Sequence, residues 1–348
     1  MQFHDQLEDL KRSDDPRKTH NIQVGDRVIP VRLKKANVST KTLIITFHGA
    51  VDRSTREVPS FVGYSPALDG AHQLAISDPS MLVDGEFSLS WYAGDKGFAT
   101  QDVLKSFFQA VCEALGIERT IYFGTSGGGF AALYYSWHHP DSIVVAGNPQ
   151  TKISNYYGGH IDRYLSACWP DQTDLSTCIC EDVGTLYAKS TPNFVIYIQA
   201  ATDAFHLNKH MVSFLADIGY RKNRPLLVNV DYFGKLGHSP TFDAYVPWLQ
   251  AAMMVSDVTI EEVVKTRHAL LAAKTAPAAL QTAAQKKNTS ARPVDDQKIQ
   301  TADMIRDWQL GDTASWPQTP TKPSSPKPSG VPPSPKDTTL ISKIFGRR

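Results

Sequence analysis

The stretch that decides the fold reads Ile121-Tyr122-Phe123-Gly124-Thr125-Ser126-Gly127-Gly128-Gly129-Phe130-Ala131-Ala132-Leu133. It opens with bulky apolar residues, which are typical of a buried strand. The small and apolar residues after the glycines predict a helix. This helix is expected to end near residues 139–141, because Pro140 disfavours the helical conformation in the residue before it. We therefore predict a strand, a sharp turn at Ser126 and a helix.

Gly124 to Gly128 match the pattern Gly-x-Ser-x-Gly of a nucleophile elbow. In such a turn the serine adopts a strained backbone conformation, and the glycines beside it leave the room that this conformation needs. The helix that begins at the serine directs backbone N–H groups and the positive end of its dipole to the place where an oxyanion forms. The alternative interpretation is a glycine-rich turn that serves packing only.

Strands and helices alternate along the chain around this unit. Residues 26–33 alternate in part and contain a proline, so we predict a half-buried edge strand there. Apolar runs predict buried strands at 42–47, 72–77, 142–147, 194–199 and 225–230. Helical patterns cover 103–115, with Gly116 as the stop, 206–218 and 247–254. The predicted class is α/β, with a mainly parallel central sheet and helices on both faces.

In such a fold ligands bind at the carboxyl ends of the strands, and two further reactive side chains follow predicted strands. Asp203 comes after the strand at 194–199, and His238 lies in a glycine-bearing loop after the last strand. A serine hydroxyl needs a base that is oriented by a third group, so we assign Ser126, His238 and Asp203 to these roles. Asp231 and Asp174 compete for the acid, which could instead cap a helix, and His238 could be a surface residue.

Residues from about 26 to 255 resemble an α/β-hydrolase, with the chain order Ser, acid, His of that fold. His48-Gly49-Ala50 resembles the oxyanion loop of the family, which implies the N–H groups of Ala50 and Gly127 as oxyanion donors. Many lipases have a run of glycines at this point, so the second donor stays open. The resemblance implies a serine hydrolase acting on an ester through an acyl-enzyme, or an acyltransferase, with a small-molecule or glycan ester as substrate.

The elbow and the aromatic insertion are also loosely similar to hydrolase-like proteins of bacterial surface-polysaccharide biosynthesis. This likeness implies the alternative function, a non-catalytic partner protein in the synthesis or export of such polysaccharides. The insertion covers about residues 148–193 and in similar hydrolases commonly forms a lid. We name Tyr156, Tyr157 and Trp169 as candidate substrate-binding residues; the same aromatics could instead fill a small satellite core.

Composition divides the 348 residues into a domain at 1–274 and a mostly disordered tail at 275–348 that is rich in Pro, Ser, Thr and Lys. Residues 286–348 carry eleven Lys or Arg against six Asp. The basic end at 341–348 could contact a membrane or a polyanion weakly, although lysines among prolines usually just keep a linker in solution. We expect no nucleic-acid partner.

Several classes of function are not expected. The sequence contains neither a Gly-x-x-x-x-Gly-Lys-Ser/Thr nor a Gly-x-Gly-x-x-Gly phosphate loop, so no cofactor is predicted. His206 and His210 have the spacing of a metal pair but lack the glutamate of His-Glu-x-x-His, and Cys178 and Cys180 lack a second pair, so no metal is predicted. The chain has no signal-like or spanning apolar run and only four cysteines, so we expect a cytoplasmic protein.

Overall fold

A computed structural model describes residues 3–83, 87–219, 224–234, 237–238 and 240–275. All of them belong to one compact unit, Met1–Gln285. The predicted disordered tail lies outside the described residues except for Thr275. No described helix has the length and apolar character that a membrane span needs.

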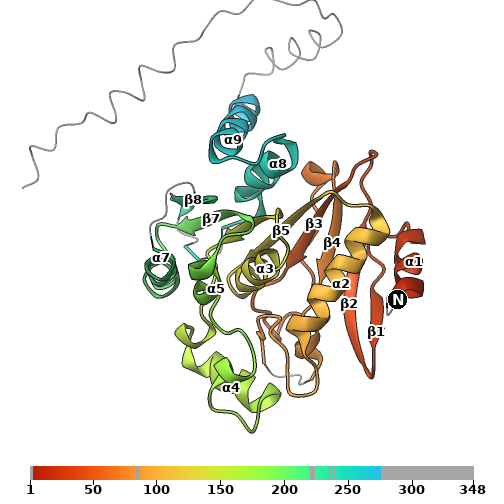
Figure 1. The fold of residues 1–348 in the computed structure, drawn as a ribbon, viewed down its shortest axis with the longest axis vertical. Coiled ribbons are helices and arrows are strands. Elements are labelled where there is room, and N and C mark those ends of the chain that lie inside the picture. Colours follow the sequence, from red (N-terminus) through yellow and green to blue (C-terminus); the bar gives the residue numbers. More distant parts are fainter. Residues whose placement is uncertain (1–2, 84–86, 220–223, 235–236, 239, 276–348) are drawn as a thin grey trace, which may run out of the picture. The chain divides into compact units, whose positions relative to one another are not determined.

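The unit is built on an eight-stranded sheet with the order β1-β2-β4-β3-β5-β6-β7-β8 (Figure 1). From β4 to β8 every neighbouring pair is parallel, whereas β2 runs antiparallel to both β1 and β4. The strands are β1 (His20–Val24), β2 (Arg27–Lys34), β3 (Thr42–Phe47), β4 (His72–Ile76), β5 (Arg119–Thr125), β6 (Ile143–Gly147), β7 (Phe194–Ala200) and β8 (Leu226–Asp231). The mainly parallel sheet confirms the predicted fold class.

One strand prediction was wrong in its position. The strand expected at the edge, β2, lies inside the sheet between β1 and β4, and the edge is formed by β1, which the sequence analysis missed. The proline that suggested an edge is tolerated inside because the carbonyl of Pro30 accepts from Ser77 N, just beyond the end of β4. In an antiparallel strand the N–H and C=O of one residue face the same neighbour, so the missing N–H of Pro30 faces Ser77 beyond the end of β4, and the ladder with β1 loses no bond.

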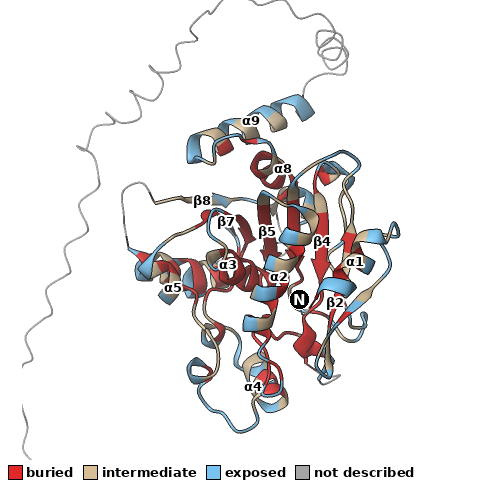
Figure 2. Cartoon of the chain, turned by 45° about the vertical axis from the view of Figure 1, so that its right-hand side comes forward, coloured by how far each residue is buried: buried red, intermediate tan, exposed pale blue. Residues whose placement is uncertain are grey.

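Helices cover both faces of the sheet, whose central strands are buried (Figure 2). Alternate residues of these strands belong to two different core clusters, one on each face. On one face Ile45 and Phe47 of β3 pack in a cluster with residues of α1 (His4–Arg12), α2 (Thr100–Leu115) and α3 (Gly127–Trp137). On the other face Ile44 packs in a second cluster with α8 (Val246–Met254), beside which lies α9 (Ile260–Thr275). The parallel strands thus bury apolar side chains on both faces, as their continuous apolar runs predicted.

The predicted helix at 206–218 is divided. It begins as α6 (Ala204–His206), continues as a π-helical turn, η5 (Leu207–Met211), and ends as α7 (Val212–Ile218). π-Helical turns are frequent at functional sites. His206 directly precedes this turn and His210 lies within it, with their ring centroids 5.2 Å apart, and the N–H of His206 donates to Asp203, three residues after β7.

The insertion between β6 and β7 contains η3 (Ile153–Asn155), α4 (Gly158–Cys168), η4 (Leu175–Thr177) and α5 (Gly184–Lys189). Part of its aromatic content is core: Tyr164 is buried, packs against Trp91 and donates its hydroxyl proton to the carbonyl of Gly94. Trp169 in turn donates from its indole to the hydroxyl of Tyr164. These aromatics therefore hold α4 to the body of the unit.

Candidate active site

Ser126 occupies the turn between β5 and α3 with φ 55° and ψ −123°, a combination that is rare for a residue with a side chain. Its backbone N–H donates to the carbonyl of Gly147 at the end of β6. A Cβ on Gly124 would collide with the backbone of Gly128, and one on Gly128 would lie 2.5 Å from the carbonyl oxygen of Phe47. The backbone thus approaches too closely at both positions for any residue except glycine.

The loop after β3 lies directly over this serine. A Cβ added to Gly49 would be 3.5 Å from the Cβ of Ser126. His48 holds the loop: one ring nitrogen, Nδ1, is 2.7 Å from the carbonyl oxygen of Gly49, and Nε2 accepts from the N–H of Asp78. A carbonyl only accepts and a backbone N–H only donates, so the two partners fix His48 as neutral with its proton on Nδ1. Burial agrees, since it lowers the pKa of His48 to about 4.

This arrangement orients the next peptide. The C=O of Gly49 points to the ring of His48, and in a trans peptide the N–H of Ala50 points the opposite way. Among the described residues nothing accepts from the N–H of Ala50 or of Gly127, the first residue of α3. Within the described part of the chain, the N–H of Ala50, which lines the same cavity as Ser126, and the N–H of Gly127, the next residue along the chain, are therefore both without an acceptor.

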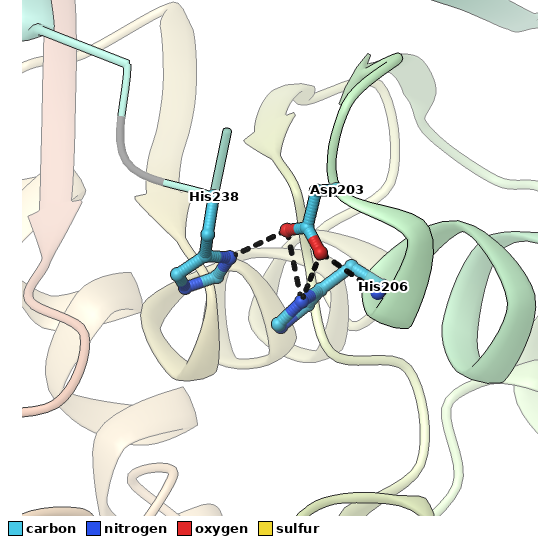
Figure 3. Close-up of side chains that lie close together, drawn as sticks. All are labelled: Asp203, His206 and His238. Carbon is cyan, nitrogen blue, oxygen red and sulfur yellow. Dashed lines mark hydrogen bonds and ion pairs between the residues drawn. The ribbon is translucent and has the colours of Figure 1, made fainter. Parts of the chain in front are cut away.

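Asp203 and His238 meet at the carboxyl ends of β7 and β8 (Figure 3). Nδ1 of His238 is 2.8 Å from Oδ2 of Asp203, which only accepts, so His238 donates and its Nε2 is left for another partner. Asp203 also accepts from the backbone N–H of His206. Burial raises the pKa of Asp203, but the hydrogen bonds from His206 and His238 outweigh it and hold this pKa well below the usual range. The carboxylate is therefore ionised near neutral pH.

The sequence analysis missed the role of His206, which it considered only as half of a metal pair. Nδ1 of His206 is 3.0 Å from Oδ2 of Asp203, and its ring stacks on that of His238 with centroids 4.1 Å apart. Burial lowers the pKa of His206, although Asp203 opposes this, and burial lowers the pKa of His210 to about 3. The neutral imidazole of His206 thus packs against the Asp203–His238 pair, and that of His210 lies next to His206.

Asp203, His206 and His238 could together hold a divalent cation, since one ligand atom from each lies within 4.8 Å of the others. Imidazole and carboxylate ligands suit zinc. The observed hydrogen bonds to Asp203 require a proton on Nδ1 of each histidine, so a cation held through these two nitrogens would displace both protons. Binding of a cation through Nδ1 of both histidines and the observed hydrogen bonds therefore exclude each other.

A cavity of about 720 Å³ joins the two sides of the site. This volume suits a small ligand or the end of a larger one. Of the predicted substrate-binding residues, Tyr156 lines the cavity, whereas Tyr157 does not line it and stacks on Phe205, and Trp169 lines a separate hollow. The lining consists of His48, Gly49, Ala50, Val51, Arg56, Ser60, Phe61, Val62, Gly63, Thr125, Ser126, Tyr156, His238, Pro240, Phe242 and Tyr245.

Ser126 and His238 share this cavity, but no hydrogen bond between them is present in the described part of the chain. The partner of the Ser126 hydroxyl is instead the side-chain amide of Gln150, at 2.9 Å. Asn148, two residues earlier, donates to the carbonyl of His238 and accepts from the N–H of Ala200. The sequence analysis missed both residues, although their position just after β6 was a usable signal, because the carboxyl ends of adjacent parallel strands meet there.

Competing carboxylates have other roles. Asp174 is the N-cap of η4 and accepts from the N–H of Ser176. Asp231 ends β8 and lies 4.0 Å from the guanidinium of Arg267. Neither contacts His238 among the interactions of the described residues, so Asp203 is the carboxylate that orients this histidine.

No protein-family model matches the sequence, and no curated protein matches it either. Among solved structures, two of the capsule O-acetyltransferase of Neisseria meningitidis serogroup A superpose with a TM-score of 0.52. They are 15% and 16% identical to this chain, and the match covers 72% of this chain and 100% of each of theirs. Acetyl xylan esterase 1 from Thermoanaerobacterium sp. aligns over 73% of this chain and 92% of its own, with 14% identity and a TM-score of 0.45.

At such identities structural likeness establishes the fold and nothing finer. The strand order, the serine at the turn between β5 and α3, and the superposition agree with one another. The chain has the α/β-hydrolase fold.

Proposed function

We propose that this protein is a serine-dependent acyl hydrolase or acyltransferase that acts on an ester. One observation carries the proposal: Ser126, strained at the elbow, shares a cavity with His238, which is hydrogen-bonded to the ionised Asp203. A strained serine beside an oriented imidazole is the arrangement that nucleophilic acyl transfer needs.

In the proposed reaction Ser126 Oγ attacks the acyl carbon and passes its proton to Nε2 of His238. The N–H groups of Ala50 and Gly127 hold the oxyanion, and Asp203 stabilises the imidazolium. The proton then goes to the leaving group as its bond to the acyl carbon breaks. In the second half, water or an acceptor hydroxyl attacks the acyl carbon and gives its proton to His238, and His238 returns that proton to Ser126 Oγ as the Oγ–acyl bond breaks.

The acyl group we propose is acetyl, and the other partner a glycan. The structural neighbour with a TM-score of 0.52 is named a capsule O-acetyltransferase, which supports this choice. Phe61, Tyr156 and Tyr245 line the cavity and offer aromatic surface for a sugar ring or an acyl chain, and the exposed Arg56 offers a cation for an anionic substrate.

Hydrolysis of a chromogenic acetyl ester, with and without soluble polysaccharide, tests the proposal. We expect wild-type protein to release the chromophore. A polysaccharide that accepts the acetyl group should accelerate this release, because it removes the acyl group from Ser126. Ser126→Ala, which removes the nucleophile hydroxyl, should reduce the rate to background in a protein whose thermal unfolding shows that it is folded. A folded wild type without turnover on a panel of acetyl and longer acyl esters contradicts the proposal.

The alternative is a non-catalytic partner protein, and one observation favours it. Ser126 makes no hydrogen bond to His238 among the described residues, and its hydroxyl is engaged by Gln150 instead. Catalytic hydrogen bonds often tighten only when substrate binds, so this geometry is compatible with both functions. Binding of polysaccharide without any acyl turnover would support the partner protein.

A further inference from the structure

Gln150 touches the oxygen of the proposed nucleophile. It follows β6, its side chain is fully buried, and its Nε2 lies 2.9 Å from Ser126 Oγ. Its backbone N–H donates to the carbonyl of Ser126 at 3.0 Å. Gln150 therefore contacts both the backbone and the hydroxyl of Ser126. The backbone hydrogen bond holds the two residues together and so helps to keep the amide next to the hydroxyl.

The direction of the amide is determined by Trp91. The indole Nε1 of Trp91 is hydrogen-bonded to Oε1 of Gln150. An indole N–H only donates, so the atom that faces it is the amide oxygen, and the NH₂ group faces Ser126. Trp91 is itself fully buried, with φ 53°, in a turn whose next residue donates its N–H to the buried carboxylate of Asp78. If the side-chain amide of Gln150 were rotated by 180°, the indole N–H of Trp91 would face the NH₂ group of the amide and would lose its acceptor.

An NH₂ group only donates, so the hydroxyl oxygen of Ser126 accepts from Gln150 and its proton is left for the base. We propose that Gln150 is a further catalytic residue, a fixed hydrogen-bond donor to the nucleophile oxygen; the inference rests on the function proposed above. As the proton moves to His238 and the Oγ–acyl bond forms, negative charge on Oγ is stabilised by the amide. When that bond breaks in the second half, Oγ is the leaving atom and is stabilised in the same way.

The chain contains a matched glutamine that serves structure alone. Gln101 on α2 is also buried, and its amide makes two hydrogen bonds, to the carbonyl and the N–H of Cys180. It does not line the cavity that holds Ser126. Loss of the Gln101 amide therefore costs a comparable number of buried hydrogen bonds with no contact to a reacting atom.

The test is the rate at which a fluorophosphonate labels Ser126, followed by intact mass, in wild type, Gln150→Met and Gln101→Met. Methionine keeps the length of glutamine and removes the donor. We expect labelling of Gln150→Met to slow by about 10- to 100-fold, the range for one hydrogen bond to a charged group, and labelling of Gln101→Met to stay within about twofold of wild type. Thermal unfolding of each variant shows that the compared proteins are folded.

Gln150→Glu and Trp91→Phe keep the inference falsifiable if Gln150→Met does not fold. Glutamate can still accept from Trp91, but its second oxygen repels charge on Oγ, so labelling should slow at least as much as in Gln150→Met. Trp91→Phe frees the amide to turn, and we expect a smaller slowing, of about 3- to 10-fold.

Equal or faster labelling of a folded Gln150→Met or Gln150→Glu overturns the role of Gln150 while the labelled wild type upholds Ser126. Absence of labelling on folded wild type overturns the proposed function, and the role of Gln150 with it.

Discussion

The two sides of the cavity differ in how their polar groups are held in place. On the side of β3 and β5, Ser126 and the N–H of Ala50 are positioned by backbone geometry and by the buried, neutral His48. On the side of β7 and β8, the half-buried His238 is positioned by the ionised Asp203, which His206 also contacts. The first side holds uncharged donors in fixed places, and the second holds an ionised carboxylate and a histidine whose charge changes in the proposed reaction.

This difference separates two requirements of acyl transfer. An oxyanion hole must not reorganise during the reaction, so fixed dipoles behind a strained turn suit it. A general base must exchange its proton, so it needs partial exposure and a charged partner. Substitutions on the acid–base side should therefore change rates with little loss of fold, whereas changes behind the oxyanion side should appear in stability.

The largest effect on the acid–base side is expected for Asp203→Asn. An amide would place N–H against Nδ1 of His238 and favour the wrong tautomer, which should lower the turnover of an acetyl ester by about 10⁴-fold. Asp174→Asn is the matched control, because this competing carboxylate only caps η4, and its rate should stay near that of wild type. Equal losses in the two variants would show that Asp203 has no special part.

His48 should make stability depend on pH on the oxyanion side. The pKa of His48 is about 4 in the folded protein against an ordinary value of 6.5. Between pH 4 and pH 6.5, His48 is therefore protonated in the unfolded chain but neutral in the folded protein. Stability then falls as the pH is lowered from 6.5 to 4, by about 3 kcal/mol at 1.36 kcal/mol for each pH unit.

His48→Asn tests this, because the amide of asparagine replaces the Nδ1 donor and does not titrate. Denaturant unfolding at several pH values should show a shallower loss in the variant over this range. Asp78, whose pKa burial raises to about 6, contributes with the opposite sign, but it is present in both proteins and cancels in the difference. Parallel curves would contradict the assignment of a neutral, buried His48.

His206→Phe should produce a smaller effect, about a 10-fold lower rate on the acetyl ester. The ring can still stack on His238, but Asp203 loses one of its hydrogen-bond donors, and one such bond to a charged group is worth about this much. His206→Asn keeps a donor in the place of Nδ1 and should recover most of the rate. If both variants are as active as wild type, His206 only fills space.

Chelation should have no effect at all. Because both Nδ1 atoms beside Asp203 hold protons, dialysis against a chelator should leave ester turnover unchanged, and added zinc should lower it by competing for those nitrogens. Activity that is lost on chelation and restored by zinc would instead identify Asp203, His206 and His238 as metal ligands.

Much of the fold could be predicted because its parallel strands are buried on both faces and leave continuous apolar runs. The strand at 42–47, the turn at Ser126 between a strand and a helix, and the stop of α2 at Gly116 lie where the sequence placed them. The edge strand β1 could not be found, since an edge strand with polar residues carries no such run. The N-terminal helix α1 and the last helix α9 were also missed; they are short or weakly amphipathic, and packing rather than local pattern decides them.

The residues of the candidate site also fall into those that the sequence could predict and those that it could not. Ser126, Asp203 and His238 could be selected because each is a reactive side chain at the end of a predicted strand or in the loop that follows it, and the structure brings Asp203 and His238 into contact. The position of Asn148 and Gln150 just after β6 was a usable signal, but an amide after a strand or a histidine on a helix has many ordinary uses, so the roles of these two residues and of His206 could not be assigned. Their roles depend on distances to Ser126, His238 and Asp203 that only the folded chain defines.

The intact mass of the protein after treatment with a fluorophosphonate shows whether Ser126 is an activated nucleophile. We expect one adduct on wild type and none on a folded Ser126→Ala. A folded wild type that gains no adduct, or a Ser126→Ala protein that gains the same one, would contradict this expectation.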